Sequence, residues 1–387
     1  MNFFQLSSRV LKDMIWPGGQ VSALDDHVDA AVQWLCVAQD RQNDGGVSLR
    51  YSLIKGWQSS YPETTGYIIP TFLKYASLTK RNELVERALR MADWELSIQN
   101  TDGSFNGGPL GSGYEGFVFD TGQVIFGFIA AHKATGDTRY LDGAVKAGRW
   151  LTQVQDEVGT WTKHAFNAIP HTYYTRVAWA LAELGAYTGE QDYSAAARRN
   201  ADWAVSQQQS NGWFDSTGFK LESHRAPYTH TIAYTLEGLL ETGACLNWQD
   251  YINVVMRSAD SLVKTMREDG YCHGTYDRDW KSDANFSCLT GNAQFALILL
   301  RLYAISGQKK YLETAKTLNR FLCARQLLEG PPETRGAIAG SYPLWGRYQR
   351  LAYPNWAAKF FVDSLLLQKK IAETDGTISE TPRRLRR

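Results

Sequence analysis

The sequence lacks an excess of charge of either sign, because 41 lysines and arginines nearly balance 40 aspartates and glutamates. A net charge of +1 provides no general electrostatic field that would hold nucleic acid or an anionic membrane. We therefore expect no nucleic-acid partner, and any anionic ligand must be held by a local cluster of basic residues.

Long apolar runs and paired cysteines are also missing. No stretch reaches about 18 uninterrupted apolar residues, and the start of the chain shows no charged segment followed by a clean apolar one. The cysteines are odd in number and scattered, which favours reduced thiols over a disulfide framework: Cys36, Cys245, Cys272, Cys288 and Cys323. These features predict a cytoplasmic protein.

Motifs for common metal and nucleophile chemistry are absent or incomplete. There is no GxSxG, Walker loop or HExxH. The DDHVD stretch at 25–29 has the DDxxD spacing of terpene synthases, but no second metal motif follows, and acidic residues suit a helix start. Cys272-His273-Gly274 resembles the zinc-binding CHG of lanthionine cyclases, but their upstream Trp-Cys-x-Gly motif is missing. We predict no metal and no cofactor.

A sequence unit is repeated six times along the chain, and its markers are an aromatic residue, a glutamine five residues later and a glycine turn. The aromatic residue is replaced by Ser261 in the fifth copy, and the glutamine there by Met266. Elsewhere the aromatic positions are Trp34, Trp94, Trp150, Trp203 and Phe321, and the glutamines are Gln39, Gln99, Gln155, Gln208 and Gln326. This regularity indicates one continuous repeat architecture.

Each unit begins with a charged helix and continues through a long loop into a more apolar helix, so the first should lie outside and the second inside. Six such hairpins predict an all-α fold, an (α/α)6 toroid, as a single domain over residues 25–370. We expect residues 1–24 to form an amphipathic N-terminal segment and residues 371–387 to be a disordered tail.

Polar residues gather at the starts of the six apolar helices, which would meet at one mouth of the toroid. N-capping is the simpler interpretation for Thr64, Asp120, Thr229, Thr290 and Asn355. Capping does not explain Arg176, His230 and Gln123, which lie within apolar helices where a buried polar group needs a partner. The loops add Trp, Tyr and Arg, which suit sugar stacking and carboxylate binding, or simply packing.

Three stretches carry a family resemblance: YPETTGYIIPT, DGGVSLRYSLIKGW and YPNWAAKFFVDSLL. Over residues 26–367 the chain resembles bacterial toroid proteins associated with exopolysaccharide or capsule biosynthesis. Tyr61, Pro62 and Thr64 are also similar to a Tyr-Pro-x-Thr stretch in the C-terminal domain of glucuronyl C5-epimerases. Those epimerases have a catalytic glutamate directly before the Tyr-Pro, whereas this chain has Ser60 there and Glu63 after it.

The leading hypothesis is an enzyme of polysaccharide biosynthesis that acts on a uronic-acid-containing glycan by C5-epimerase-like or lyase-like proton abstraction. Arg176 would hold the carboxylate, His230 and Tyr61 would act as base and acid, and Glu63 would orient them. The expected substrate-binding residues are Asp120, Gln123, His171, Tyr174, Arg225, Asn292, Tyr353 and Asn355.

Two alternatives stay open. Glu63 and Asp120 could form the carboxylate pair of a glycoside hydrolase. The protein could also be a non-catalytic glycan-binding subunit of a synthase complex. In each case the expected partner is an oligosaccharide or polysaccharide, with possible peripheral contact to a membrane-bound synthase.

Overall fold

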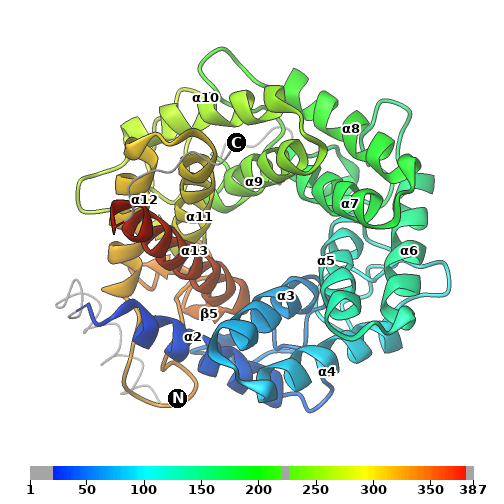
Figure 1. Ribbon diagram of the computed structural model, residues 1–387, viewed down its shortest axis with the longest axis horizontal. Helices are drawn as coiled ribbons and strands as arrows, with labels where there is room; N and C mark the ends of the chain where they lie inside the picture. The colour runs from blue at the N-terminus through cyan, green and yellow to red at the C-terminus, as the bar shows by residue number, and fades with distance from the viewer. Residues whose placement is uncertain (1–20, 220–225, 381–387) are drawn as a thin grey trace.

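The computed structural model describes residues 21–219 and 226–380 of the chain. In these ranges twelve α-helices form two concentric rings, which confirms the predicted all-α toroid (Figure 1). The inner helices are α3 (Pro62–Thr79), α5 (Val118–Thr135), α7 (Thr175–Thr188), α9 (Thr229–Leu246), α11 (Leu289–Ser306) and α13 (Asn355–Glu380). The outer helices are α2 (Leu24–Asp40), α4 (Asn82–Ile98), α6 (Thr138–Gln153), α8 (Gln191–Ser206), α10 (Gln249–Thr265) and α12 (Lys309–Cys323).

The division into rings follows the distribution of apolar residues. In α5 every residue from Val118 to Ile129 is buried, as expected for a helix with neighbours on all sides. The outer helix α4 buries only one stripe, which includes Leu84, Ala88 and Met91. The inner ring closes where α13 packs against α3, so the last repeat contacts the first.

The repeated glutamines join neighbouring units of the outer ring. The side-chain amide of Gln99 donates to the carbonyl of Gly103 in its own turn at 3.0 Å and to that of Gly143 in α6 at 2.9 Å. The side-chain amide of Gln155 likewise donates to the carbonyl of Gly159 in its own turn and to that of Ala196 in α8. The amide of Gln326 closes the ring, because it donates to the carbonyl of His27 in α2.

The turn glycines adopt backbone conformations that require glycine. Gly103 has φ +94°, and a Cβ atom there would come within 2.4 Å of the carbonyl oxygen of Lys146 in the next outer helix. Gly159 has φ +87° and the same close approach to Arg199. The Gln and Gly of each repeat are therefore a matched pair that fixes the distance between outer helices.

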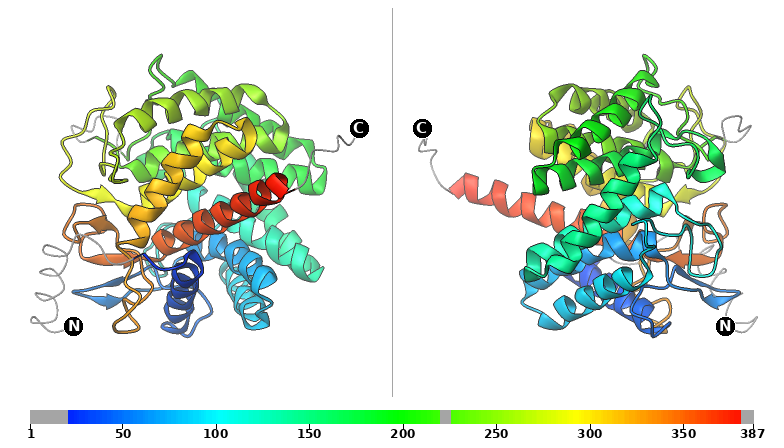
Figure 2. Two further views of the ribbon diagram at one scale, coloured as in Figure 1. Left: turned by 60° about the vertical axis from the view of Figure 1, so that its left-hand side comes forward. Right: turned by 90° about the vertical axis from the view of Figure 1, so that its right-hand side faces the viewer.

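The long loops and the few strands lie at the end of the toroid where the inner helices begin (Figure 2). A three-stranded sheet has the order β2 (Gly56–Trp57), β1 (Arg50–Ser52), β5 (Ala352–Pro354), and a second pairs β3 (Ser287–Cys288) with β4 (Ser341–Tyr342). Two short 3₁₀ helices, η1 (Phe166–Ala168) and η2 (Thr172–Tyr174), precede α7. Because β1 and β5 are paired antiparallel, the first and last loops are also joined at this end.

The C-terminal tail begins later than the sequence predicts. The helix α13 continues to Glu380 and extends beyond the ring at the end opposite the strands (Figure 2). Ile371 is buried against the core and the Tyr303 hydroxyl donates to Asp375, so the expectation of disorder from residue 371 is wrong for 371–380. Residues 1–20 of the expected N-terminal segment lie outside the described residues. Among the helices described, none is long and apolar enough to cross a membrane.

Candidate active site

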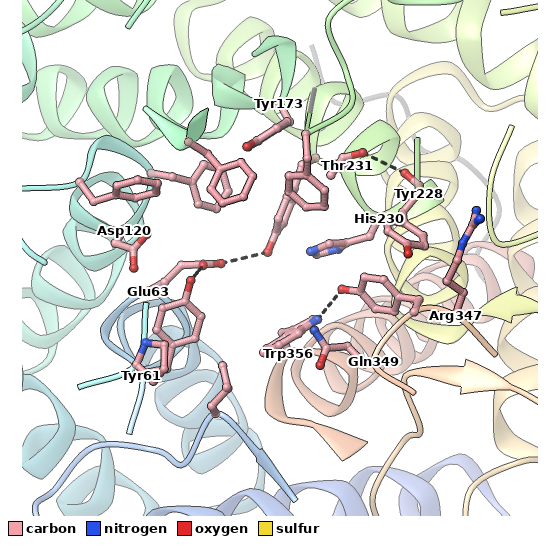
Figure 3. Close-up of a pocket in the computed structure, with 18 residues that line it drawn as sticks. Tyr61, Glu63, Asp120, Tyr173, Tyr228, His230, Thr231, Arg347, Gln349 and Trp356 are labelled. Carbon is pink, nitrogen blue, oxygen red and sulfur yellow. Dashed lines mark hydrogen bonds between the residues drawn. The ribbon is translucent and has the colours of Figure 1, made fainter. Parts of the chain in front are cut away.

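A cavity of about 460 Å³ lies on the toroid axis at the end where the inner helices begin. Its polar and charged lining residues are Tyr61, Glu63, Asp120, Tyr173, Tyr228, His230, Thr231, Tyr234, Arg347, Tyr348 and Gln349. Its apolar lining residues are Leu49, Pro109, Phe117, Phe119, Phe166, Phe219 and Trp356. Tyr61, Glu63 and Asp120 occupy one side, and His230, Trp356 and Arg347 occupy the other (Figure 3).

Glu63 lies in the first turn of α3 and is surrounded by phenols. The Tyr61 hydroxyl donates to its Oε2, and the hydroxyls of Tyr67 and Tyr234 are each 3.5 Å from its Oε1. The side chain is only 9% exposed. Burial raises the pKa of Glu63 to about 7, although the hydrogen bond from Tyr61 and the charge of Arg176 act in the opposite direction. Glu63 can therefore both hold and release a proton near neutral pH.

Asp120 faces the same group from the first turn of α5. Its Oδ1 accepts a hydrogen bond from the backbone N–H of Gly108 at 2.9 Å. Burial, followed by the negative charge of Glu63, raises the pKa of Asp120 well above its ordinary value, while the hydrogen bond from the N–H of Gly108 opposes this rise. Because the charge of Glu63 disfavours ionisation of Asp120, the two buried carboxyls titrate as a pair and hold protons at pH values where an exposed carboxyl is ionised.

His230 supplies a neutral imidazole from the first turn of α9. Its Nδ1 is 2.8 Å from Oε1 of Gln294. Because an amide oxygen only accepts, Nδ1 carries the hydrogen and Nε2 keeps a lone pair. Burial lowers the pKa of His230 to about 4. The ring points toward the side of the cavity that holds Glu63, and it lies 4.3 Å from the Tyr234 ring (Figure 3).

Aromatic rings form most of the cavity wall. Phe119 contacts Tyr173 at 5.4 Å and Tyr234 at 5.2 Å between ring centroids. On the opposite side the indole N–H of Trp356 donates to the Tyr348 hydroxyl at 2.8 Å. Such flat apolar faces with hydroxyls at their edges are suited to sugar rings.

Arg347 is the only lysine or arginine among the described residues that line this cavity. Its guanidinium lies 5.7 Å from the Tyr228 ring and 5.8 Å from the Phe286 ring, and the side chain is exposed at the rim. Because Arg347 forms no ion pair with a described residue, its guanidinium is available to an anionic group of a ligand in the cavity.

Arg176 does not line this cavity, so it cannot be the carboxylate clamp that the sequence predicts. Its side chain is 1% exposed, and Nη1 lies 2.6 Å from Oε2 of Glu237. Its Nε donates to Oε1 of Gln123 at 3.0 Å. Arg176 is thus a buried, paired charge below the cavity floor, and Gln123 is its partner rather than a substrate ligand.

The other expected substrate-binding residues also have structural roles. Both ring nitrogens of His171 face backbone carbonyls, and the Tyr174 hydroxyl accepts from the backbone N–H of Phe166. Asn292 bonds Ser287 and Gly270, and Asn355 bonds Ser48 and Thr64. Tyr353 is buried in β5 opposite Tyr51. None of the five lines the cavity, and Arg225 lies outside the described residues.

Capping is not the reason for the polar helix starts. The residues at the N-caps of α3, α5 and α9 are Tyr61, Phe117 and Tyr228, none of which makes a side-chain cap bond. At α11 the cap is the sulfur of Cys288, which accepts from the N–H of Gly291. Buried cross-links between units, together with the cavity, account for these polar residues instead.

The sequence analysis missed Tyr234 and assigned no site role to Arg347, although both line the cavity. Tyr234 lies one turn after His230 on the same face of α9, so helical spacing from His230 would have found it. Arg347 lies in the loop before α13, where only the general abundance of basic and aromatic residues gave a signal.

These features define an (α/α) toroid with a polar, aromatic-lined cavity at its loop end. A family model described as the ulvan lyase N-terminal domain matches residues 118–289, which include Asp120 and His230. No curated protein sequence matches the chain.

Several solved structures are similar in fold. An unsaturated glucuronyl hydrolase specific for heparin is 16% identical with a TM-score of 0.72, over 90% of this chain and 98% of that one. The cellobiose 2-epimerase of Bacillus thermoamylovorans is 10% identical with a TM-score of 0.70, over 95% and 100%. A polysaccharide lyase is 14% identical with a TM-score of 0.67, over 91% and 99%. At these identities the similarity establishes the fold alone.

Proposed function

We propose that the protein is a glycoside hydrolase that removes a uronic acid residue from the end of a glycan. The observation that carries this proposal is the pair of buried carboxyls, Glu63 and Asp120, in one cavity, with the Tyr61 hydroxyl donating to Glu63. A carboxyl with a pKa of about 7 suits general acid catalysis near neutral pH. The similarity in fold to unsaturated glucuronyl hydrolases adds support by analogy.

The carboxyl pair can perform hydrolysis with all protons accounted for. Protonated Glu63 donates its proton to the leaving oxygen as the bond between the anomeric carbon and that oxygen breaks. The reaction requires the singly protonated pair with its proton on Glu63, so that Asp120, then ionised, accepts a proton from the water whose oxygen forms the new bond to the anomeric carbon. Proton exchange between the two carboxyls then restores the starting state.

The closed floor of the cavity favours action at a chain end. The hydroxyls of Tyr67 and Tyr234 lie 3.4 Å apart beneath Glu63, and the paired Arg176 lies below them. A polymer therefore cannot thread through the toroid, and it would enter from the loop end with Arg347 available for its carboxylate.

A second candidate is proton abstraction at C5, by a lyase or an epimerase, and His230 favours it. The unprotonated Nε2 is a base inside the cavity, and a bound substrate carboxylate would raise its pKa. The protonated carboxyls would stabilise the negative charge that develops on the substrate carboxylate. The ulvan lyase match over residues 118–289 supports this candidate by analogy.

The ultraviolet absorbance of the C4=C5 double bond distinguishes the reactions. The full chain is incubated with uronic-acid glycans whose terminal uronic acid is either unsaturated or saturated. We expect absorbance to fall with the unsaturated substrate, because the released sugar opens at C1 and its C4=C5 enol then takes a proton at C4 and becomes a ketone. A lyase would raise the absorbance with the saturated substrate. An epimerase would leave it constant and exchange H5 for deuterium in heavy water.

Matched variants test whether the chemistry belongs to this cavity. Glu63→Gln should abolish the change in absorbance. Glu313 is an exposed carboxylate on α12, and Glu313→Gln should leave the change in absorbance as it is in the unmodified protein. If glycan binds but no product forms with any of these substrates, the protein is a glycan-binding subunit and the hydrolase proposal fails. A role in biosynthesis, a cytoplasmic location and contact with a synthase complex stay predictions from the sequence.

A further inference from the structure

A second cavity, the far cavity, lies on the toroid axis beyond the floor of the candidate active site. Its volume is about 490 Å³, and all six inner helices contribute to its lining. Among the described residues, six cationic side chains line it: Lys74, Lys133, Arg176, Arg301, Lys359 and Lys370. The reaction proposed above uses none of them.

The far cavity and the candidate active site are separated by one layer of side chains. Tyr234 lines the first cavity and Tyr67 lines the far cavity, and their hydroxyls are 3.4 Å apart. The guanidinium of Arg176 lies 4.9 Å from the Tyr234 ring and 5.7 Å from the Tyr67 ring. A ligand in the far cavity therefore occupies a different site from a substrate beside Glu63.

The far cavity has more positive than negative charge. Four acidic side chains line it, and each is paired with one of the cations at N to O distances of 2.6–3.6 Å. Lys74 and Lys370 form no ion pair with a described residue, so two positive charges are left uncompensated.

Helix dipoles account for only part of this cluster, since Lys133 lies in the last turn of α5 and most of the other cations do not lie in a last turn. Lysines often stabilise the last turn of a helix, where carbonyls lack partners. Lys359 and Lys370 belong to α13, which continues to Glu380, and Lys74 precedes the last residue of α3 by more than a turn. The dipole effect is confined to the terminal turn, so it does not explain Lys74, Lys359 and Lys370.

The far cavity also offers an aromatic face. Trp179 is partly exposed there, with its ring 4.4 Å from the ring of Phe126 and 5.0 Å from the guanidinium of Arg176. A flat indole beside cations can hold the apolar face of a small ring while lysines hold its anionic group.

We propose that the far cavity is a binding site for a small anion, a compact molecule that carries a phosphate or carboxylate group. Lys74 and Lys370 supply the uncompensated charge, and the ion-paired residues hold the walls in place. Inorganic phosphate and a free sugar acid share this chemistry, and binding at this site does not require the proposed hydrolase activity.

Calorimetric titration of the full chain tests the proposal, with inorganic phosphate and glucuronate as separate probes. We expect at least one to bind, and its Kd to rise at least tenfold in the double variant Lys74→Gln/Lys370→Gln. Because the candidate active site can also take a uronic acid, only binding that weakens in the double variant is assigned to the far cavity. Stronger binding of glucuronate than of phosphate by this criterion would identify a sugar acid as the ligand, and the reverse order would identify a phosphate.

Two controls make the result specific. Lys264→Gln/Lys309→Gln removes the same charge from α10 and α12, away from the cavity, and should leave Kd unchanged. Glu63→Gln should also leave it unchanged, which separates this site from the candidate active site. Because Lys74 and Lys370 are exposed, their variants should fold, as thermal unfolding would verify. Equal affinity in the double variant, or no binding of either probe, would overturn the proposal.

Discussion

The hydroxyl of Tyr61 donates a hydrogen bond to the carboxyl of Glu63, two residues further along the start of α3. This short sequence separation places a phenol and a carboxyl in one cavity, where Asp120 from the next inner helix completes the group. The first predictions concern the proton that these residues share.

Glu63→Gln should reduce kcat by about 10²-fold or more, because the amide cannot donate the proton of a general acid. In the unmodified protein the rate should fall as pH rises through about 7, where Glu63 loses its proton. A pH–rate profile measures this. A profile that is flat across this range, together with an active Glu63→Gln variant, would exclude Glu63 as the acid.

The same carboxyl makes stability depend on pH. The pKa of Glu63 is about 7 in the fold and 4.5 when exposed, so between these values the folded state binds the extra proton. Stability should therefore fall as pH rises from about 4.5 to 7, by about 3 kcal/mol from this group. Glu63→Gln removes this dependence. In urea unfolding, the free energy of unfolding of the variant minus that of the unmodified protein should therefore be larger at pH 8 than at pH 5.

Gln294→Glu should raise the pKa of His230 from about 4, because a carboxylate beside Nδ1–H favours the imidazolium. The expected rise is about 1–3 units, measured by NMR titration of the imidazole resonances. His132, which bonds Tyr187 near the other end of α5, serves as the internal reference and should not shift. An unchanged His230 titration would show that Nδ1 does not face residue 294.

Arg347→Gln should raise KM for a uronic acid substrate about tenfold or more and leave kcat nearly unchanged, because the lost interaction is a charge-assisted hydrogen bond of about 1.5–3 kcal/mol. A neutral sugar analogue should bind the variant and the unmodified protein equally. Arg350→Gln is the matched control, since Arg350 is exposed in the same loop but does not line the cavity. Equal effects of both substitutions would point to general electrostatics instead.

Gln99→Met should destabilise the fold by about 1–3 kcal/mol, because the carbonyls of Gly103 and Gly143 lose their shared donor. Methionine is the appropriate replacement, since it occupies this position in the fifth unit as Met266. Urea unfolding measures the loss, with Gln191→Met, an exposed position at the start of α8, as the control.

The fold could be predicted because its marker residues have a physical role. The glutamines recur at a constant distance from an aromatic residue because each one must reach the next outer helix, and Gln99 and Gln155 also reach their own turns. A role that depends on fixed geometry produces a fixed spacing, and the spacing is visible in the sequence. The number of units and the order of rings follow from it.

The site could be predicted only in part, because position in a helix does not determine where a long side chain points. Glu63, Asp120 and His230 belong to first turns and do face the cavity. Arg176 is also in a first turn, but its side chain pairs with Glu237, about two turns into α9, and so faces the other end of the axis. Nothing in the sequence around Arg176 identifies that distant partner.

Met266 leaves one junction of the outer ring without a glutamine bridge. Its thioether has no hydrogen to donate, so the junction between α10 and α12 lacks the amide bridge that Gln99 and Gln326 provide elsewhere. Local unfolding of a closed ring of helices should begin at the junction with the weakest contacts. Backbone amide hydrogens of α10 and α12 at this junction should therefore exchange with solvent before the corresponding amides of α4 and α6. Separation of α10 from α12 would convert the closed toroid into an open, curved array of helical hairpins.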